Sequence, residues 1–167
     1  MKLNLGIGQK HIEGFVNCDL NDETDPDRRF DFMEHFPFED NSISFIQSKH
    51  TIEHLQNITN FMNECYRILK ENGGLVIETP HFSNFQALTN PFHIKLYAPI
   101  SFISFTKDSY NAYESKTCFE ITETTFKLRY LRFLEFLVNK HPCFFDTHLS
   151  QWLPAESFKI KLRKVKR

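Results

Sequence analysis

Short runs in which hydrophobic and polar residues alternate fill the first half of the chain, and this spacing is typical of β-strands. Leu3 and Leu5 alternate with polar neighbours until a glycine loop, Gly6-Ile7-Gly8, interrupts them. In order, the pattern predicts strands at residues 3–5, 15–20, 30–32, 43–48 and 75–77. The last run, Leu75-Val76-Ile77, is apolar on both faces and therefore suits the buried centre of a parallel sheet.

Helical spacing appears between residues 58 and 70. The apolar positions of this stretch share one helical face and are Phe61, Met62, Cys65, Ile68 and Leu69. Asn57 or Thr59 can cap the beginning of the helix, and Asn72-Gly73-Gly74 is expected to end it.

The second half of the chain is less regular. A loop is expected over residues 81–97, and residues 99–105 fit either a short helix or a strand. Residues 117–131 and 158–162 alternate as strands, and a helical stretch interrupted at Pro142 lies between them. Because strands and helices alternate, we expect an α/β fold with a mostly parallel sheet, in one domain over residues 1–167.

Composition narrows the range of functions that the chain could have. The chain has 167 residues, 41% of them hydrophobic, and a net charge of −1, so its overall charge gives no reason to expect nucleic-acid binding. The four cysteines lie far apart and form no CxxC pair, which argues against a cysteine zinc module and a disulfide scaffold. No apolar run is long enough to span a membrane, and we expect a cytoplasmic protein. The charge is uneven, since residues 1–60 hold 11 acids against 5 bases.

Candidate ligand-binding residues cluster where the first strands end. Gly6 and Gly8 allow a tight turn and a close approach of a ligand to the backbone. Asp19 ends the second strand and could accept hydrogen bonds from both hydroxyls of a ribose, and Asp31 could accept one from an adenine amino group. A full GxGxxG fingerprint is absent, and Asp19 follows Gly6 by about 13 residues where a dinucleotide site expects roughly 20. A nucleoside ligand without a pyrophosphate therefore fits better.

A series of short motifs, each occurring once, follows along the chain in an order that is typical of one protein family. They are Leu3-Asn4-Leu5-Gly6-Ile7-Gly8, Val16-Asn17-Cys18-Asp19-Leu20, Phe36-Pro37-Phe38-Glu39-Asp40-Asn41-Ser42, Glu53-His54-Leu55 and Tyr66-Arg67-Ile68-Leu69-Lys70-Glu71-Asn72-Gly73-Gly74. In this order the chain resembles a small class I S-adenosylmethionine-dependent methyltransferase of the type 11 kind. Asn90-Pro91-Phe92-His93 and Trp152-Leu153-Pro154-Ala155 extend the resemblance over nearly the whole chain.

The resemblance implies a Rossmann-like sheet of seven strands, mostly parallel with the last strand antiparallel, and trimmed at its N-terminal side. It implies S-adenosyl-L-methionine as cofactor and methyl transfer to an oxygen or nitrogen of a small-molecule or sugar-like acceptor. The cofactor-binding residues that it implies are Gly6, Gly8, Asp19, Leu20, Asp31, Phe32, Ser48 and His50.

Two departures from the family leave a second interpretation open. Ile7 stands where a small residue or cysteine is common, and only nine residues, 6–14, join the first two strands. A parallel crossover usually needs at least about 10–12 residues, so the connecting helix is expected to be missing. A degenerate methyltransferase fold that serves as a cofactor-binding or assembly module is therefore the alternative, and a second copy of the chain could cover the cofactor in a homo-oligomer.

Histidines supply the candidate chemistry of the acceptor side. His81 and His93 lie in the expected loop and could act as general bases, since an unperturbed histidine titrates near neutral pH. His50-Thr51-Ile52-Glu53-His54 also matches the HxxEH pattern of inverted zinc proteases. Because these residues fall at a strand-to-helix junction of the methyltransferase pattern, we favour one histidine facing the pocket and one at the surface, and expect no metal.

Overall fold

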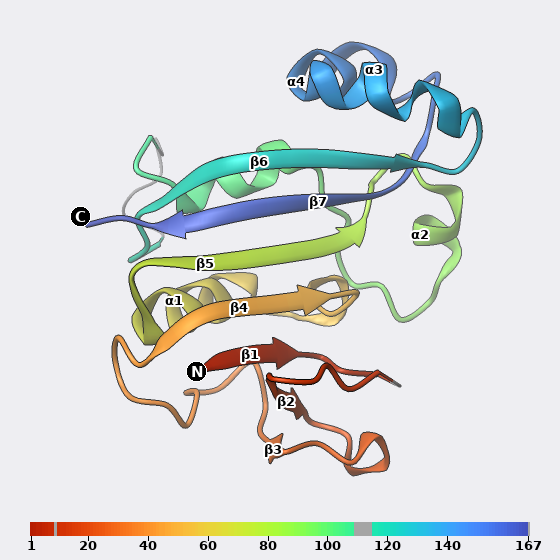
Figure 1. Cartoon of the computed structure of the whole chain (residues 1–167). Helices are drawn as coiled ribbons and strands as arrows, with labels where there is room; N and C mark the ends of the chain where they lie inside the picture. The colour runs from red at the N-terminus through yellow and green to blue at the C-terminus, as the bar shows by residue number, and fades with distance from the viewer. Residues whose placement is uncertain (9, 109–114, 167) are drawn as a thin grey trace.

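Seven strands form one sheet in the computed structural model, which describes residues 1–8, 10–108 and 115–166; Gln9, residues 109–114 and Arg167 lie outside the described residues. The strands are β1 (Lys2–Leu5), β2 (Val16–Asp19), β3 (Arg28–Arg29), β4 (Ile43–Lys49), β5 (Leu69–Pro80), β6 (Phe119–Leu128) and β7 (Ala155–Lys164). Their order across the sheet is β3-β2-β1-β4-β5-β7-β6 (Figure 1). The order reverses between β1 and β4, which is where ligands bind in open α/β sheets.

Strand directions confirm the expected fold class. β1 pairs in parallel with β2 and with β4, and β3 and β5 continue the parallel part of the sheet. β7 runs antiparallel to both β5 and β6. The fold is therefore Rossmann-like, with the last strand in the chain inserted antiparallel between β5 and β6.

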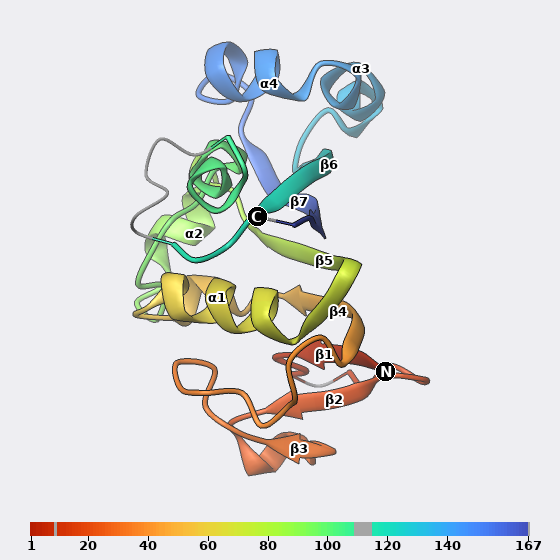
Figure 2. The same cartoon turned by 90° about the vertical axis from the view of Figure 1, so that its left-hand side faces the viewer.

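Helices flank the sheet and join its strands. The α-helices are α1 (Ile58–Ile68), α2 (Phe85–Thr89), α3 (Glu135–Lys140) and α4 (Pro142–Phe144). Shorter turns are η1 (Asp22–Thr24), η2 (Ile52–His54), η3 (Pro99–Phe105), η4 (Arg132–Leu134) and the π-helical η5 (Phe145–Leu149). Figure 2 shows α1 and α2 on the same side of the sheet and α4 beyond its β6–β7 end. Every helix among the described residues is too short or too polar to span a bilayer.

The sheet buries one face and leaves much of the other in water. In β7, Phe158, Ile160 and Leu162 are buried, whereas Lys159 between the first two and Arg163 after the last are exposed. This alternation is the period of two that a strand gives to a half-buried sheet. α1 contributes Phe61, Met62, Cys65 and Ile68 to the same core, as its helical spacing predicts.

The structure revises some of the elements expected from the sequence and decides one that was left open. The third strand is β3 at Arg28–Arg29, so the prediction of a strand at residues 30–32 is wrong. Phe30 and Phe32 instead pack edge to face with one another and with Phe36. The helix ends at Ile68, because Leu69 already pairs with Ile43 as the first residue of β5. The segment 99–105 is a 3₁₀ helix, which resolves the choice left open by its sequence.

Candidate functional site

A cavity of about 1060 Å³ opens at the carboxyl ends of β1, β2 and β4. Its lining residues come from the glycine loop, from the ends of β2 and β4, and from the segments after β3 and β4. They are Asn4, Gly6, Ile7, Gly8, Lys10, His11, Ile12, Asp19, Leu20, Asp31, Phe32, Met33, Gln47, Lys49, His50, Thr51, His54 and Leu55. Seven of the eight residues predicted to bind the cofactor are therefore brought together here, the exception being Ser48.

The glycine loop is held in place by contacts that leave no room for a side chain at Gly6. Gly6 has a φ of +77°, and a Cβ there would lie 2.0 Å from Oγ1 of Thr51. The Thr51 hydroxyl donates to the carbonyl oxygen of Leu5 at 3.2 Å, and the Gly6 amide donates to that of Cys18 at 2.9 Å. The loop therefore turns sharply between β2 and the segment after β4, with its backbone facing the cavity.

Asp19 connects β2 to this loop. Its Oδ2 accepts a hydrogen bond from the Gly8 amide at 3.3 Å, and its Oδ1 accepts one from the Asn21 amide at 3.1 Å. Each carboxylate oxygen can accept more than one hydrogen bond, so both still have capacity toward the cavity. These amides orient the carboxylate before any ligand arrives.

The segment after β3 supplies an apolar wall and a second carboxylate. Phe32 is buried at 5% exposure, and Leu20, which lines the same cavity, remains half exposed. Asp31 accepts a hydrogen bond from the Met33 amide through Oδ1 at 2.8 Å, which leaves Oδ2 for another partner. An acid beside two apolar side chains suits a flat heteroaromatic ring that carries an amino group.

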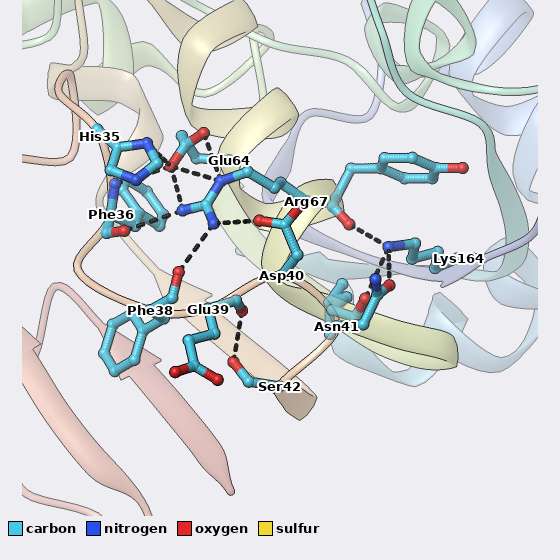
Figure 3. Close-up of polar contacts among 12 residues, drawn as sticks. His35, Phe36, Phe38, Glu39, Asp40, Asn41, Ser42, Glu64, Arg67 and Lys164 are labelled. Atoms are coloured by element: carbon cyan, nitrogen blue, oxygen red, sulfur yellow. Dashed lines mark hydrogen bonds and ion pairs between the residues drawn. The ribbon is translucent and has the colours of Figure 1, made fainter.

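A network on α1 fixes this segment relative to the sheet (Figure 3). Arg67 donates to the carbonyl oxygens of Phe36 and Phe38 and to the carboxylates of Glu64 and Asp40, while Glu64 accepts from the Phe36 amide at 2.8 Å. Burial alone would raise the pKa of Glu64, but the hydrogen bonds from Arg67 and the Phe36 amide outweigh it and hold that pKa below its ordinary value. The network therefore anchors the chain just after the cavity wall.

β4 contributes side chains that differ from those predicted on it. Gln47 and Lys49 line the cavity, whereas Ser48 is buried at 1% exposure on the opposite face, and its hydroxyl has no hydrogen-bond partner among the described residues. The period of two along a strand separates Ser48 from its neighbours and could have shown this. His50 follows the strand with a φ of +51°, an uncommon conformation for a non-glycine residue, and lines the cavity as predicted.

A second cavity of about 370 Å³ adjoins the first. His50 and His54 line both cavities, and His93 lines only the second. Glu53 lies in its wall with its side chain 3% exposed; Oε2 accepts a hydrogen bond from the Thr79 hydroxyl at 3.0 Å, and Oε1 lies 3.3 Å from Nδ1 of His50. Burial, with the charge of Glu53, raises the pKa of nearby Tyr97 to about 12.

His81, the other histidine predicted to act as a base, lies outside the lining of both cavities. It is fully buried, with Nε2 3.0 Å from Oδ1 of Asp146 and Nδ1 2.7 Å from the Ser83 hydroxyl. Phe126 and Phe158 pack edge to face against the ring. In this structure both ring nitrogens of His81 are therefore engaged with protein groups, and its contacts join β5, β6, β7 and η5.

Comparison with protein families finds one match within the chain. A model described as a methyltransferase domain matches residues 14–77, which run from just before β2 into β5. The matched region includes Asp19, Asp31 and His50 and leaves out β1 and the glycine loop. None of the curated proteins compared with the sequence matches it.

Solved structures share the fold across almost the whole chain. An S-adenosylmethionine-dependent methyltransferase from Archaeoglobus fulgidus is 17% identical, with a TM-score of 0.63 over 98% of this chain and 85% of that one. One from Aquifex aeolicus is 14% identical, with a TM-score of 0.60 over 98% and 81%. Geranyl diphosphate C-methyltransferase from Streptomyces coelicolor, solved with Mg²⁺, geranyl diphosphate and S-adenosyl-L-homocysteine, is 10% identical, with a TM-score of 0.60 over 98% and 70%.

Proposed function

We propose that this chain, which has the fold of the S-adenosylmethionine-dependent methyltransferases, is itself such an enzyme and binds S-adenosyl-L-methionine in the larger cavity. The observation that carries the proposal is the position of Asp19. Its carboxylate ends β2, is oriented by the Gly8 amide at 3.3 Å, and faces a cavity at the point where the strand order reverses. That arrangement suits the two hydroxyls of a ribose.

The other cavity residues fit the rest of the cofactor. Thr51 leaves no room for a Cβ at Gly6, so only backbone atoms of Gly6 line the place that we assign to the methionine part of the cofactor. Asp31 and Phe32 offer a carboxylate oxygen and an aromatic wall to the adenine, and Leu20 adds a second apolar side chain. His50 lies at the border with the second cavity. We assign these residues, rather than Ser48, to cofactor binding, because the Ser48 side chain is buried away from the cavity.

The bound cofactor would supply a methyl group activated by a positively charged sulfonium. The chain would then have to bind an acceptor so that its oxygen or nitrogen lies in line with that methyl group. The second cavity, which shares His50 and His54 with the first, is the place we assign to a small-molecule or sugar-like acceptor. Of the two histidines proposed as bases, His93 lines this cavity, whereas His81 is enclosed by other side chains.

Calorimetry with S-adenosylmethionine and S-adenosylhomocysteine tests the cofactor assignment directly. We expect Asp19→Ala to weaken binding about 10- to 150-fold, because hydrogen bonds to a charged group contribute about 1.5–3 kcal/mol. Glu23→Ala, an exposed acid on the neighbouring turn η1, is the matched control and should bind like the unmodified protein. Unchanged affinity in Asp19→Ala would refute the assignment of Asp19 to the ribose. If the unmodified protein bound neither compound, the proposal that the chain is a methyltransferase would be refuted.

Methyl transfer separates the enzyme from a binding module. The connection between β1 and β2 contains no helix within its described residues, 6–8 and 10–15, so the cavity lacks a wall that such a helix would provide. A screen of acceptors with methyl-labelled cofactor is expected to yield labelled product. Cofactor binding without transfer to any acceptor would favour the binding module.

We also propose that this activity takes place in the cytoplasm and that the chain forms a homo-oligomer. Light scattering on the purified protein would test the oligomer.

A further inference from the structure

Three side chains that commonly bind metals meet in the wall of the second cavity. Glu53 and His54 belong to η2, and His93 comes from the segment after α2. One donor atom from each residue lies within 4.8 Å of the donor atoms of the other two. The rings of His54 and His93 pack edge to face with their centroids 5.0 Å apart. Side chains from two distant parts of the sequence are thus held together at one place.

Hydrogen bonds to backbone carbonyls determine which nitrogen each histidine offers. Nδ1 of His54 lies 2.9 Å from the carbonyl oxygen of Phe92, and Nδ1 of His93 lies 3.1 Å from that of Ala87. A carbonyl oxygen only accepts, so Nδ1 carries the hydrogen in both rings and Nε2 carries the lone pair. Histidines that bind metals commonly donate their other N–H to a backbone carbonyl in this way, which orients the ring.

Asn90 independently supports this assignment for His93. Its Oδ1 accepts the Phe92 amide at 3.0 Å, which directs its Nδ2 toward Nε2 of His93 at 2.9 Å. Nδ2 can only donate, so Nε2 of His93 is an acceptor. The same lone pair is available to a cation once Asn90 turns away.

Glu53 gives the cluster a negative charge that the protein leaves largely uncompensated. Its side chain is 3% exposed, and its carboxylate contacts are the Thr79 hydroxyl and the His50 ring. Among the described residues, no lysine or arginine forms an ion pair with Glu53. A buried carboxylate without an opposite charge is costly, and a divalent cation would supply that charge.

We propose that Glu53, His54 and His93 bind a divalent transition-metal ion of the Zn²⁺ type. Two imidazoles and one carboxylate are the donor set of several catalytic zinc sites, and they leave a coordination position open. Imidazole donors favour Zn²⁺, Co²⁺ or Ni²⁺ over Mg²⁺, which prefers oxygen ligands. In a tetrahedral site with bonds of about 2.0–2.1 Å the donors lie roughly 3.3 Å apart, so no pair of donor atoms would have to close in by more than about 1.5 Å.

The role of the ion rests on the proposed function. Because His50 and His54 line both cavities, the ion would lie between the cofactor and the acceptor. A hydroxyl of the acceptor bound at the open position would lose its proton to solvent more readily, as metal-bound water does. A lone pair of that oxygen would then form the C–O bond while the C–S bond breaks and its electron pair stays on sulfur. Bound to the ion, His93 would no longer be free to act as the base.

Metal binding by the purified, chelator-treated protein tests the site without cofactor or acceptor. We expect one Zn²⁺ per chain by elemental analysis after dialysis, and a visible absorption band when Co²⁺ is added in its place. Glu53→Gln and His93→Gln, which nearly preserve side-chain size, should each weaken Zn²⁺ binding at least tenfold. His148→Gln alters an exposed histidine that packs on Phe144 and should leave binding unchanged.

Each result decides a separate part of the proposal. Substoichiometric Zn²⁺, or equal affinity in Glu53→Gln, His93→Gln and the unmodified protein, would overturn the site. Circular dichroism confirms that each variant is folded before its affinity is compared. Metal binding without cofactor binding would uphold the site and defeat the proposed function. Full methyl transfer by the metal-free protein would overturn the role of the ion in the reaction.

Discussion

At the scale of single residues, Gly6 and Gly14 allow steric crowding to be separated from backbone strain. Their φ angles are +77° and +78°, so a side chain at either position enters the same left-handed region. A Cβ at Gly6 would collide with Thr51, whereas a Cβ at Gly14 would meet no atom of the described residues within 4 Å. The collision involves Cβ and Cγ2 of Thr51 as well as its hydroxyl, so a change of rotamer alone does not relieve it.

We therefore expect Gly6→Ala to destabilise the protein more than Gly14→Ala. Both substitutions incur the left-handed cost of about 1–2 kcal/mol, and only Gly6→Ala must also displace Thr51. Urea denaturation of the two variants gives the difference in unfolding free energy, which we expect to exceed about 1 kcal/mol. Equal losses would mean that Thr51 moves at no cost and that the loop is not tightly held.

How well the sequence predicts each site residue depends on the local structure around that residue. Asp19 and the glycines lie at the end of strands that their own sequence marks clearly, so their placement beside one cavity follows from the parallel sheet. Ser48 was assigned to the cavity, but the strand period turns it inward and brings Gln47 and Lys49 there instead. The meeting of His93 with His54 depends on a hydrogen bond from the loop after α2 back to Ala87 in that helix, which no spacing in the sequence reveals.

At the scale of elements, α1 is tied to its surroundings by side chains at its C-terminal end (Figure 3). Lys164, near the end of β7, donates through Nζ to the carbonyl oxygens of Tyr66 and Leu69 at 2.7 Å and to Oδ1 of Asn41 at 2.8 Å. Cations suit the C-terminal end of a helix, where carbonyl groups lack partners within the helix. The last strand of the sheet thus caps the helix that precedes β5.

Lys164→Met should lower the free energy of unfolding by about 1–3 kcal/mol, because it keeps the apolar stem and removes a charged donor from three oxygens. Lys166→Met, two residues further along, alters an exposed lysine and serves as control. Urea denaturation of both variants measures the effect. A loss in Lys166→Met equal to that in Lys164→Met would assign it to overall charge instead of to the cap.

The Glu64–Arg67 contact makes a separate prediction about pH. The pKa of Glu64 is lower in the folded protein than its ordinary value of 4.5, so its ionised form contributes stability above about pH 4.5. That contribution disappears as the pH falls through the lower pKa of the folded state. Glu64→Gln should lose about 1–2 kcal/mol at pH 7 and show a weaker decline of stability below pH 4.5. Urea denaturation at a series of pH values measures the effect, and Glu39→Gln, which alters an exposed acid, is the control. If the free energy of unfolding of Glu64→Gln fell with pH as steeply as that of the unmodified protein, the prediction would be contradicted.

Element boundaries follow the sequence where burial and periodicity agree. β7 and α1 each bury the apolar face that their spacing predicts. The stretch Phe30-Asp31-Phe32 has the same alternation, yet it forms no strand: Phe32 is buried, Phe30 is partly buried, and both rings pack in a cluster of aromatic side chains that includes Phe36. The Phe30 amide still donates to the carbonyl oxygen of Asp19 in β2 at 3.2 Å, but the ladder ends there. A pattern of three residues therefore does not show how far the pairing with a neighbouring strand extends.

At the scale of the whole molecule, cofactor binding and folding are linked equilibria, which offers a test that needs no acceptor. A ligand that binds only the folded protein stabilises it by about 2.7 kcal/mol at one hundred times its dissociation constant. For a protein of this size, each kcal/mol shifts the melting temperature by about 2–4 °C, so S-adenosylhomocysteine at that concentration should raise it by roughly 5–11 °C.

Two variants already described separate binding from stability in this measurement. Lys164→Met perturbs the cap of α1, outside the residues that line the cofactor cavity, so it should melt at a lower temperature yet keep nearly the whole shift. Asp19→Ala removes the carboxylate that faces the cavity, so at the same S-adenosylhomocysteine concentration it should lose most of the shift. Differential scanning calorimetry of the three proteins, each with and without ligand, gives all six temperatures. If Asp19→Ala kept the full shift, the ligand would be held elsewhere, and the cavity at the ends of β1, β2 and β4 would not be the cofactor site.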